Sequence, residues 1–338
     1  MSMTMKRIAA ELGVSVTTVS KVLNDQPDIG SETRARVLQH VERLGYRPNA
    51  VARSLSLKRT HTLGVVIPDL MHSFFVEIVA GIEPVMSPRG YGLLLCSSGE
   101  NPAKERSELE MLRARQVDGI VLASAHASGN TDVLKQVARR GCALVLIDRD
   151  DHPTVDCHRV ITDDEEVGRL ATDHLIRTGR LAVAHIGGPP VLHAKRRETG
   201  YLAALRSHGL KPRSEWIVPA GFMEADGYRG MKQLLALEPR PAIDAVFAAN
   251  DPAAIGAMKA VWEAGLSVPN DIAMVGAGDV AYGDLLRVPL TTVSWSKAEQ
   301  GRRAAELLLD QMGPNPDGPF QRVVIPPRLV VRGSSVRA

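Results

Sequence analysis

The sequence predicts an all-α domain at the N-terminus, followed by two α/β subdomains that each contain a parallel sheet. Three observations carry this prediction. Apolar residues in the first part recur with a helical period. From Thr62 onward, short apolar runs alternate with amphipathic stretches, a pattern typical of parallel sheets covered by helices. The alternation starts again beyond Arg159–Ile161, so two similar subdomains are expected.

The segment Gly13–Asn24 predicts a tight turn followed by a short helix. Gly13 can take a positive φ without steric cost, and the Ser15 hydroxyl can cap the helix. One face of that helix is apolar and consists of Val19, Val22 and Leu23. The opposite face carries small, hydroxylated or cationic side chains suited to phosphates and base edges, namely Val16, Thr17, Ser20 and Lys21.

Two further helices are expected beside this segment. Thr4 can cap a helix over Met5–Leu12, and Ser31 can cap another over Glu32–Leu44, which Gly45 would end. The residues expected to face inward are Met5, Ile8, Ala9, Leu12, Val37, Leu38, Val41 and Leu44. Three short helices with a sharp turn between the first two predict a helix-turn-helix bundle that binds DNA. A plain three-helix surface subdomain is the alternative.

The charge distribution supports the DNA-binding interpretation. Residues 1–60 contain ten Lys/Arg and five Asp/Glu, whereas the remaining chain contains 31 and 33. The positive excess therefore belongs to the N-terminal domain. The three cysteines lack metal-binding spacing, and Cys96 and Cys142 are expected to be buried thiols. Without a signal peptide or a membrane-length apolar run, a reducing cytoplasm is expected.

The predicted domains are a head over residues 1–48, a hinge and linker over 49–60, and a large domain over 61–338. Asn49 can cap a helix over Ala50–Leu55 that is too short to be stable alone, so it should form only against a partner. In the large domain, strands are predicted over 63–67, 92–96, 120–122, 143–147, 183–186, 217–218, 245–248 and 273–275. Helices are predicted over 74–86, 103–113, 132–140, 165–178, 195–208, 225–236 and 252–264. Ligands of such sheets bind at the carboxyl ends of strands, here in the cleft between two lobes.

Ordered sequence patterns cover nearly the whole chain. They are Lys6–Ser15, Thr18–Asn24, Gly45–Leu55, Pro68-Asp69 with Phe74-Phe75, Val117–Ile120, Ile147–Arg149, Gly187–Pro189, Ala249–Asp251, Val268-Pro269, Pro289–Val293 and Leu329–Ser334. Together they closely resemble the lactose-repressor/galactose-repressor (LacI/GalR) family of bacterial transcription regulators. The resemblance implies a periplasmic-binding-protein-like effector domain whose chain crosses three times between its lobes. Lobe 1 would contain 61–161 and 291–322, and lobe 2 would contain 162–290 and 323–333.

The resemblance also implies roles for residues of the head and hinge. Val16, Thr17 and Lys21 would face the major groove, where a lysine can donate to guanine. The residues expected to position the head on phosphates are Ser15, Thr18, Ser20, Asn24 and Asn49. In the hinge helix, which includes Ala52 and Arg53, Leu55 matches the leucine that the family wedges between base pairs. A leucine that merely covers the next domain is the alternative.

In the cleft, the resemblance implies that Arg197 grips the effector and that Phe222 stacks on it. Polar contacts would come from Asp148 and Asn250, and an apolar wall from Phe74 and Phe75. The alternatives are a solvated helix residue for Arg197, helix caps for Asp148 and Asn250, and core packing for the phenylalanines.

Two departures from the family pattern bear on the ligand. Gly278 replaces an aspartate that commonly binds a sugar hydroxyl, and His72 stands where asparagine is common. Near Arg197 the chain also carries the basic residues His193, Lys195 and Arg196. We therefore expect an anionic effector, such as a sugar acid or a phosphorylated sugar, contacted by His72, Lys195 and Arg197. A bulkier neutral ligand is the alternative.

The sequence favours a sequence-specific transcriptional repressor that binds a palindromic operator as a homodimer and responds to a small effector. No heptad-patterned tail follows Arg332, which favours a dimer over a tetramer. Acidic and histidine residues crowd 148–158, but we expect them to be solvated rather than metal-bound, and no cofactor is expected. The chain lacks a Walker loop, a nucleophile elbow and HExxH, so an enzyme is not expected. The alternative is a sugar-binding receptor whose head docks to a protein.

Overall fold

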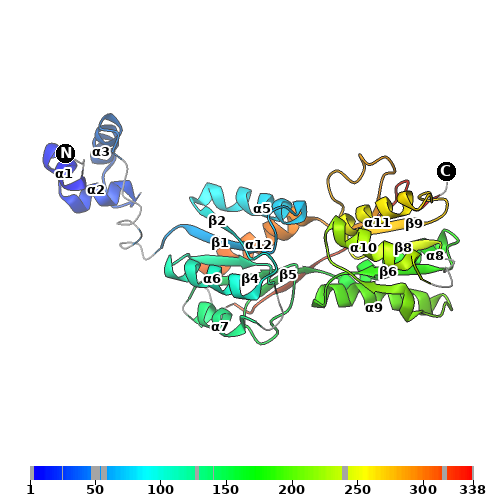
Figure 1. Cartoon of the computed structure of the whole chain (residues 1–338). Helices are drawn as coiled ribbons and strands as arrows, with labels where there is room; N and C mark the ends of the chain where they lie inside the picture. Colours follow the sequence, from blue (N-terminus) through cyan, green and yellow to red (C-terminus); the bar gives the residue numbers. More distant parts are fainter. Residues whose placement is uncertain are drawn as a thin grey trace. The chain divides into compact units, whose positions relative to one another are not determined.

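The computed structural model describes residues 4–24, 26–46, 54, 59–125, 129–139, 141–237, 243–313 and 318–336. The chain divides into two compact units, Met1–His61 and Thr62–Ala338, which are considered separately (Figure 1). The expected hinge residues Asn49, Ala52, Arg53 and Leu55 lie outside the described residues.

The first unit contains the three expected helices, α1 (Met5–Leu12), α2 (Val16–Leu23) and α3 (Ser31–Arg43). Thr4 Oγ1 accepts from the Arg7 N–H, and Ser15 Oγ accepts from the Thr18 N–H. The tight turn between α1 and α2 has Gly13 at φ 67°, as its position predicted. The small core consists of Ile8, Ala9, Val19, Val22 and Val37.

Two expectations for α3 were wrong. Gly30 occupies the cap position without a side-chain hydrogen bond, and Ser31 is already helical. Leu38 is 46% exposed, whereas Val37 is fully buried. Since consecutive helical residues point about 100° apart, a helix that packs through Val37 and Val41 turns Leu38 away from the core.

The second unit contains two six-stranded sheets. The first sheet has the order β11-β5-β4-β3-β1-β2, and the second has the order β12-β10-β9-β8-β6-β7. The strands of the first are β1 (Thr62–Ile67), β2 (Gly92–Ser97), β3 (Gly119–Leu122), β4 (Ala143–Ile147), β5 (His158–Thr162) and β11 (Arg322–Ile325). Those of the second are β6 (Val183–Gly187), β7 (Ile217–Pro219), β8 (Ala245–Ala248), β9 (Ala273–Ala277), β10 (Thr291–Ser294) and β12 (Arg328–Val330). All described pairings are parallel except β10 with β12.

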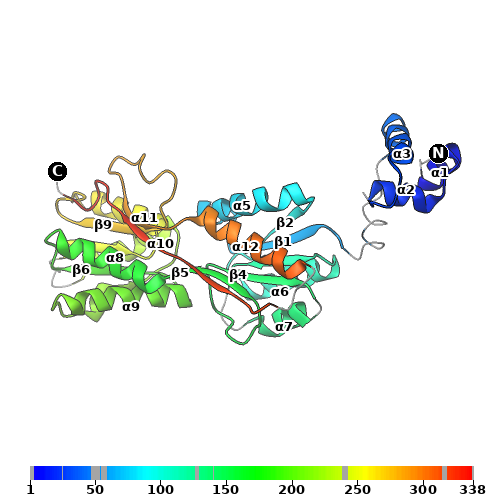
Figure 2. The same ribbon diagram turned by 180° about the vertical axis from the view of Figure 1, so that it is seen from behind.

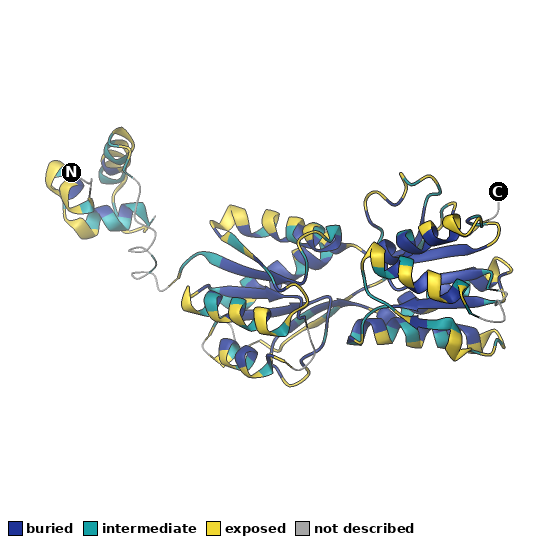
Figure 3. Cartoon of the chain, in the orientation of Figure 1, coloured by how far each residue is buried: buried dark blue, intermediate teal, exposed yellow. Residues whose placement is uncertain are grey.

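Helices cover both faces of each sheet (Figures 1 and 2). In the first lobe they are α5 (Ser73–Met86), α6 (Pro102–Ala114), α7 (Thr131–Arg139) and α12 (Lys297–Met312). In the second lobe they are α8 (Asp164–Arg177), α9 (Leu192–Ser207), α10 (Glu224–Leu235) and α11 (Asp251–Glu263). Helices α5 and α12 pack together, as do α8 with α9 and α10 with α11. The central strands of each sheet are almost entirely buried (Figure 3), which explains their continuous apolar sequences, whereas the edge strands β2, β7, β11 and β12 are partly exposed.

The chain crosses between the lobes three times, but two crossing points differ from those expected. β10 pairs with β9 in the second sheet, and β11 pairs with β5 in the first. Residues 291–294 therefore belong to lobe 2, and residues 323–325 to lobe 1. Thr291, Thr292 and Val293 are β-branched residues that favour a strand, and this strand extends the second sheet before the chain returns to the first lobe. Pro326 and Pro327, which cannot donate to a ladder, separate β11 from β12.

Within each lobe, paired helices approach backbone to backbone. A Cβ added at Gly200 of α9 would lie 1.9 Å from the Glu165 carbonyl oxygen of α8. One added at Gly168 of α8 would lie 1.9 Å from the Arg197 carbonyl oxygen. The same close approach joins α5 to α12, where Gly301 contacts Ile78. No described helix has both the length and the apolar character that a membrane span requires.

Candidate functional site

A cavity of about 300 Å³ lies between the two lobes at the carboxyl ends of the strands. Eight of the nine expected effector residues line it, namely His72, Phe74, Phe75, Asp148, Arg197, Phe222, Asn250 and Gly278. Lys195 is exposed and does not line it. Lys195 and Arg197 are two positions apart in α9 (Leu192–Ser207), so their side chains point about 200° apart and only Arg197 faces the cavity.

Aromatic rings form the walls of the cavity on both lobes. In the first lobe, Phe74 packs edge-on against Phe75 and Trp295, with ring centroids 5.1 and 5.7 Å away. In the second lobe, His193 stacks on Phe222 at 5.1 Å. Trp295 was not expected here, because the strand that delivers it, β10, was not recognised in the sequence. These rings give the cavity an aromatic wall on each lobe.

Arg197 is a buried, fully engaged side chain rather than a solvated helix residue. Its Nε and Nη2 both lie 2.9 Å from Asp164 Oδ1, and its Nη1 donates to the Ala249 carbonyl at 2.7 Å. The guanidinium carbon lies 5.2 Å from the centre of the Trp295 ring. Burial raises the pKa of Asp164 to about 7, although the Arg197 charge opposes this shift. The guanidinium is therefore already paired within the protein.

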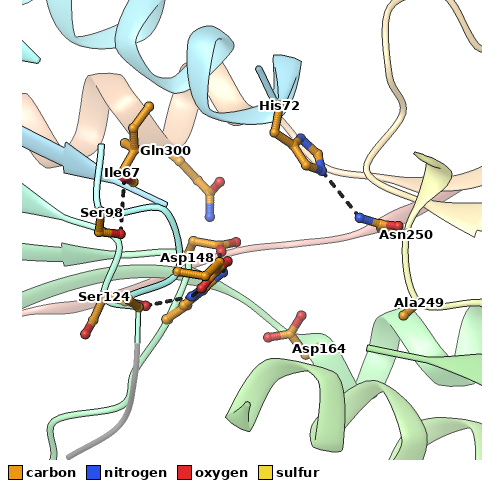
Figure 4. A network of polar contacts seen from close by, with 12 residues as sticks. Ile67, His72, Ser98, Ser124, Asp148, Asp164, Ala249, Asn250 and Gln300 are labelled. Atoms are coloured by element: carbon orange, nitrogen blue, oxygen red, sulfur yellow. Dashed lines mark hydrogen bonds and ion pairs between the residues drawn. The ribbon is translucent and has the colours of Figure 1, made fainter. Parts of the chain in front are cut away.

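Arg149, which the sequence interpretation did not place in the site, also lines the cavity. Its Nη1 and Nη2 donate to the Glu100 carboxylate at 2.8 and 2.6 Å, and Nη1 donates to the Ser124 carbonyl. Its buried Nε has no hydrogen-bond partner in the described part of the chain and lies 3.8 Å from Asp148 Oδ2. Burial raises the pKa of Asp148. Figure 4 shows Asp148 near Ser124, on the side of the cavity formed by the first lobe.

His72 and Asn250 face each other across the cavity, from the two lobes (Figure 4). His72 Nε2 lies 3.3 Å from Asn250 Nδ2, and His72 Nδ1 lies 3.3 Å from the Phe74 backbone nitrogen. Burial lowers the pKa of His72, and it lowers the pKa of His193 well below the ordinary range. Both rings are therefore neutral at neutral pH.

These positions remove the basis for the expected anionic effector. Of the three proposed cationic contacts, His72 is neutral, Lys195 lies away from the cavity, and Arg197 is paired. The ionisable side chains in the described lining include two arginines and four carboxylic acids, namely Arg149, Arg197, Asp69, Glu100, Asp148 and Asp226. The cavity therefore has no unpaired cation among its described lining residues.

The backbone conformation at position 278 explains why a glycine occurs there. Its φ is 121°, a conformation that side-chain-bearing residues rarely adopt. The Gly278 carbonyl accepts from Lys297 Nζ at 2.6 Å, and the Asp279 carbonyl accepts from the same ammonium at 2.9 Å. Lys297 is the first residue of α12, which belongs to the first lobe. Its ammonium therefore ties the loop at Gly278 and Asp279, in the second lobe, to the first lobe.

In the first unit, α2 presents the expected surface. Val16 is 42% exposed and Thr17 is exposed, whereas Val19 and Val22 are buried. The partly exposed or exposed positions expected to contact phosphates are Ser15, Thr18, Ser20 and Asn24. Lys21 pairs with Asp28, an interaction that the spacing did not predict. A contact between the Lys21 ammonium and any other acceptor would have to replace this pair.

The polar loop 148–158 is not solvated as expected. Asp150 pairs with Arg159 and Arg322, and buried His152 contacts Ser124 and Thr131. Throughout the described ranges, no group of three or more His, Cys, Asp or Glu residues is arranged to hold a metal ion.

Comparison with known proteins gives consistent matches along the chain. Residues 4–49 match the family of bacterial regulatory proteins of the lacI type, and residues 60–332 match the periplasmic binding proteins and sugar binding domain of the LacI family. The chain is 35% identical over 334 residues to the HTH-type transcriptional repressor PurR of Mannheimia succiniciproducens, covering 98% of each protein.

Two solved structures are similar over nearly the whole chain. The Lac repressor dimer bound to operator and the anti-inducer ONPF has a TM-score of 0.87 at 25% identity, with 100% of both chains covered. The complex of the transcriptional regulator CelR with cellobiose has a TM-score of 0.73 at 29% identity, covering 98% of this chain and 100% of that one. With a matching head, a matching two-lobed domain and repressor relatives over its full length, the chain belongs to the LacI family of DNA-binding transcriptional repressors.

Proposed function

We propose that this repressor binds a two-fold symmetric operator as a homodimer and that a small molecule in the cavity between its lobes controls that binding. The observation that carries the proposal is the cavity itself, which takes its lining from both lobes and from Trp295 at a crossover between them. A ligand that contacts both lobes can bias their relative position. The ligand then changes the operator affinity by the difference between its binding free energies for the two lobe arrangements, which is typically about 1–3 kcal/mol.

For the DNA contacts, we propose that α2 enters the major groove with Val16, Thr17 and Lys21 toward the bases. The exposure of Val16 and Thr17 supports this orientation. The phosphate contacts would come from Ser15, Thr18, Ser20, Asn24 and Asn49. The hinge roles of Ala52, Arg53 and Leu55 rest on the family resemblance. The repressor would act in the cytoplasm, where operator DNA is accessible.

For the effector, we propose a compact uncharged molecule with a ring face and hydroxyl groups, in place of the anion expected from the sequence. The His193–Phe222 pair and the Phe74–Trp295 pair offer apolar walls on the two lobes. Asp148 lines the cavity and can accept from a ligand hydroxyl group. An anion would have to compete with Glu100 and Asp164 for the two arginines.

The DNA proposal is tested by selecting operators from a random double-stranded library with the full-length chain, followed by gel-shift measurements. A palindromic consensus bound at one dimer per site is expected, and Thr17→Ala should weaken specific binding by about 1–3 kcal/mol. A matched surface control is Thr199→Ala on α9, which should bind normally. Binding that ignores sequence would contradict the proposal.

The effector proposal is tested by calorimetry with neutral mono- and disaccharides, sugar acids and sugar phosphates. Saturable binding of a neutral sugar that Phe222→Ala weakens is expected. Preferential binding of an acid or a phosphate would instead support the anionic ligand and overturn the charge argument.

A further inference from the structure

The contact between His72 and Asn250 has an unusual hydrogen-bonding requirement. Asn250 caps α11, so its Oδ1 accepts from the Ala253 N–H at 3.0 Å. Its Nδ2 donates to the Phe222 carbonyl at 2.8 Å. These two bonds fix the amide orientation, and the atom that faces His72 Nε2 is therefore an N–H donor.

The other ring nitrogen of His72 also faces a donor. His72 Nδ1 lies 3.3 Å from the Phe74 backbone N–H at the start of α5. A neutral imidazole has one nitrogen that can accept, whereas an imidazolium has none. The bond to Asn250 forms in the tautomer that carries its proton on Nδ1, because Nε2 can then accept. Protonation of Nε2 would place an N–H group against the Asn250 N–H and remove the contact that joins α5 of the first lobe to α11 of the second.

We propose that His72 and Asn250 form a proton-sensitive latch across the cavity. The latch holds the lobes in the described geometry while His72 is neutral, and it releases them when the ring is protonated. The family relationship does not supply this residue pair, since His72 is one of the positions at which the chain departs from the family pattern.

The surroundings of His72 set the pH range of the latch. The charged groups that act on it are Asp69 on its own loop, Glu224 of α10, Arg197 of α9 and Arg149 after β4. The carboxylates favour the imidazolium and the arginines oppose it, while burial among Phe74 and Phe75 gives the largest effect and favours the neutral ring. Release therefore requires a pH below 6.5, the ordinary pKa of histidine.

Trp295 offers a direct readout, because it is buried at a crossover and lines the same cavity. Of the three tryptophans, Trp216 and Trp262 can be replaced by phenylalanine, which leaves Trp295 as the sole indole. We would titrate this full-length protein from pH 7.5 to 5.0 and follow both Trp295 emission and the radius of gyration by small-angle scattering. The expected result is a red shift with expansion, at a midpoint below pH 6.5.

Two variants test the assignment. His72→Gln should abolish the transition, whereas His208→Gln, a surface histidine paired with Asp173, should leave it unchanged. Asn250→Asp keeps an acceptor that can cap α11 and places a carboxylate opposite His72. Because an imidazolium can donate to that carboxylate, acidification should no longer release the lobes in this variant. This variant decides the matter if His72→Gln does not fold.

The latch is overturned if wild type shows no transition, if His72→Gln retains it, if His208→Gln loses it, or if Asn250→Asp still shows the red shift and expansion below pH 6.5. The measurement uses neither operator nor effector, so its outcome is independent of the proposed function. If the cavity binds an effector as proposed above, the latch would also make the effector affinity depend on pH, and this consequence rests on the proposed function.

Discussion

Replacing Asp164 by asparagine should destabilise the two-lobed unit strongly. The carboxylate receives two guanidinium nitrogens of Arg197 at 2.9 Å, and the two side chains are only 2% and 5% exposed. Removing one charge of such a buried pair leaves the other uncompensated, which typically costs about 3–5 kcal/mol. Asp164→Asn should therefore lower the free energy of unfolding by about 3–5 kcal/mol at pH 8.

The reciprocal change should cost less at lower pH. In Arg197→Met, the buried carboxyl of Asp164 can take up a proton, since its pKa is already about 7 with the arginine present. We expect the loss in Arg197→Met to shrink as the pH falls from 8 to 6, whereas the loss in Asp164→Asn should not. The double variant should lose less than the sum of the two single losses.

Equilibrium urea unfolding, followed by circular dichroism, measures these values. The matched control is Glu166→Gln on the same helix, which breaks an exposed pair with Arg169 and should cost less than about 1 kcal/mol. A loss in Asp164→Asn no larger than in this control would refute the reasoning. Equal losses for Arg197→Met at pH 6 and pH 8 would refute the protonation argument.

Three further predictions follow from packing, titration and the cavity loop. Gly200→Ala should unfold at markedly lower urea concentration and lose at least about 3 kcal/mol of unfolding free energy, because its Cβ would meet a carbonyl oxygen of α8. In the control Gly92→Ala, the added Cβ has no atom within 4 Å, and the loss should be less than about 1 kcal/mol. Burial lowers the pKa of His185 to about 4, so its contribution to stability is complete above pH 6.5 and lost as the pH falls toward 4. His185→Phe should flatten that part of the stability–pH curve, measured by thermal unfolding, and an unchanged slope would contradict the assignment. Lys297→Met should release the Gly278 carbonyl and weaken effector binding in calorimetry more than it lowers the melting temperature, whereas the exposed Lys259→Met should change neither.

Local patterns in the sequence predicted most of the elements. The helices of the head, the strand-end positions of the cavity and the caps Thr4 and Ser15 all depend on residues close in sequence, so spacing alone was enough. Ser31 was wrongly expected to be a cap because the sequence cannot show that Gly30 already holds the entry conformation. Lys195 was wrongly expected in the cavity because residues two positions apart in a helix point in different directions, and the sequence does not show which of them faces inward.

Contacts between distant residues could not be read in the same way. Glu100 and Arg149 are 49 residues apart, and their pairing decides whether the cavity has a free cation. Trp295 reaches the cavity only because β10 joins the second sheet, a result of tertiary packing on a short β-branched run. The expectation of an anionic effector counted charged side chains without knowing their partners, and those partners remove its basis.

The glycines at the helix seams have a consequence for how such a molecule can change over evolutionary time. At Gly168 and Gly200, one helix backbone occupies the space that any side chain would need, so neither position can drift without separating α8 from α9. Most side chains that line the cavity border its empty space, so substitutions there meet less resistance from neighbouring backbone than substitutions at Gly168 or Gly200. Substitutions in the cavity can therefore change which effector the chain binds. The close helix contacts at the glycines meanwhile preserve the lobes whose relative movement would transmit effector binding.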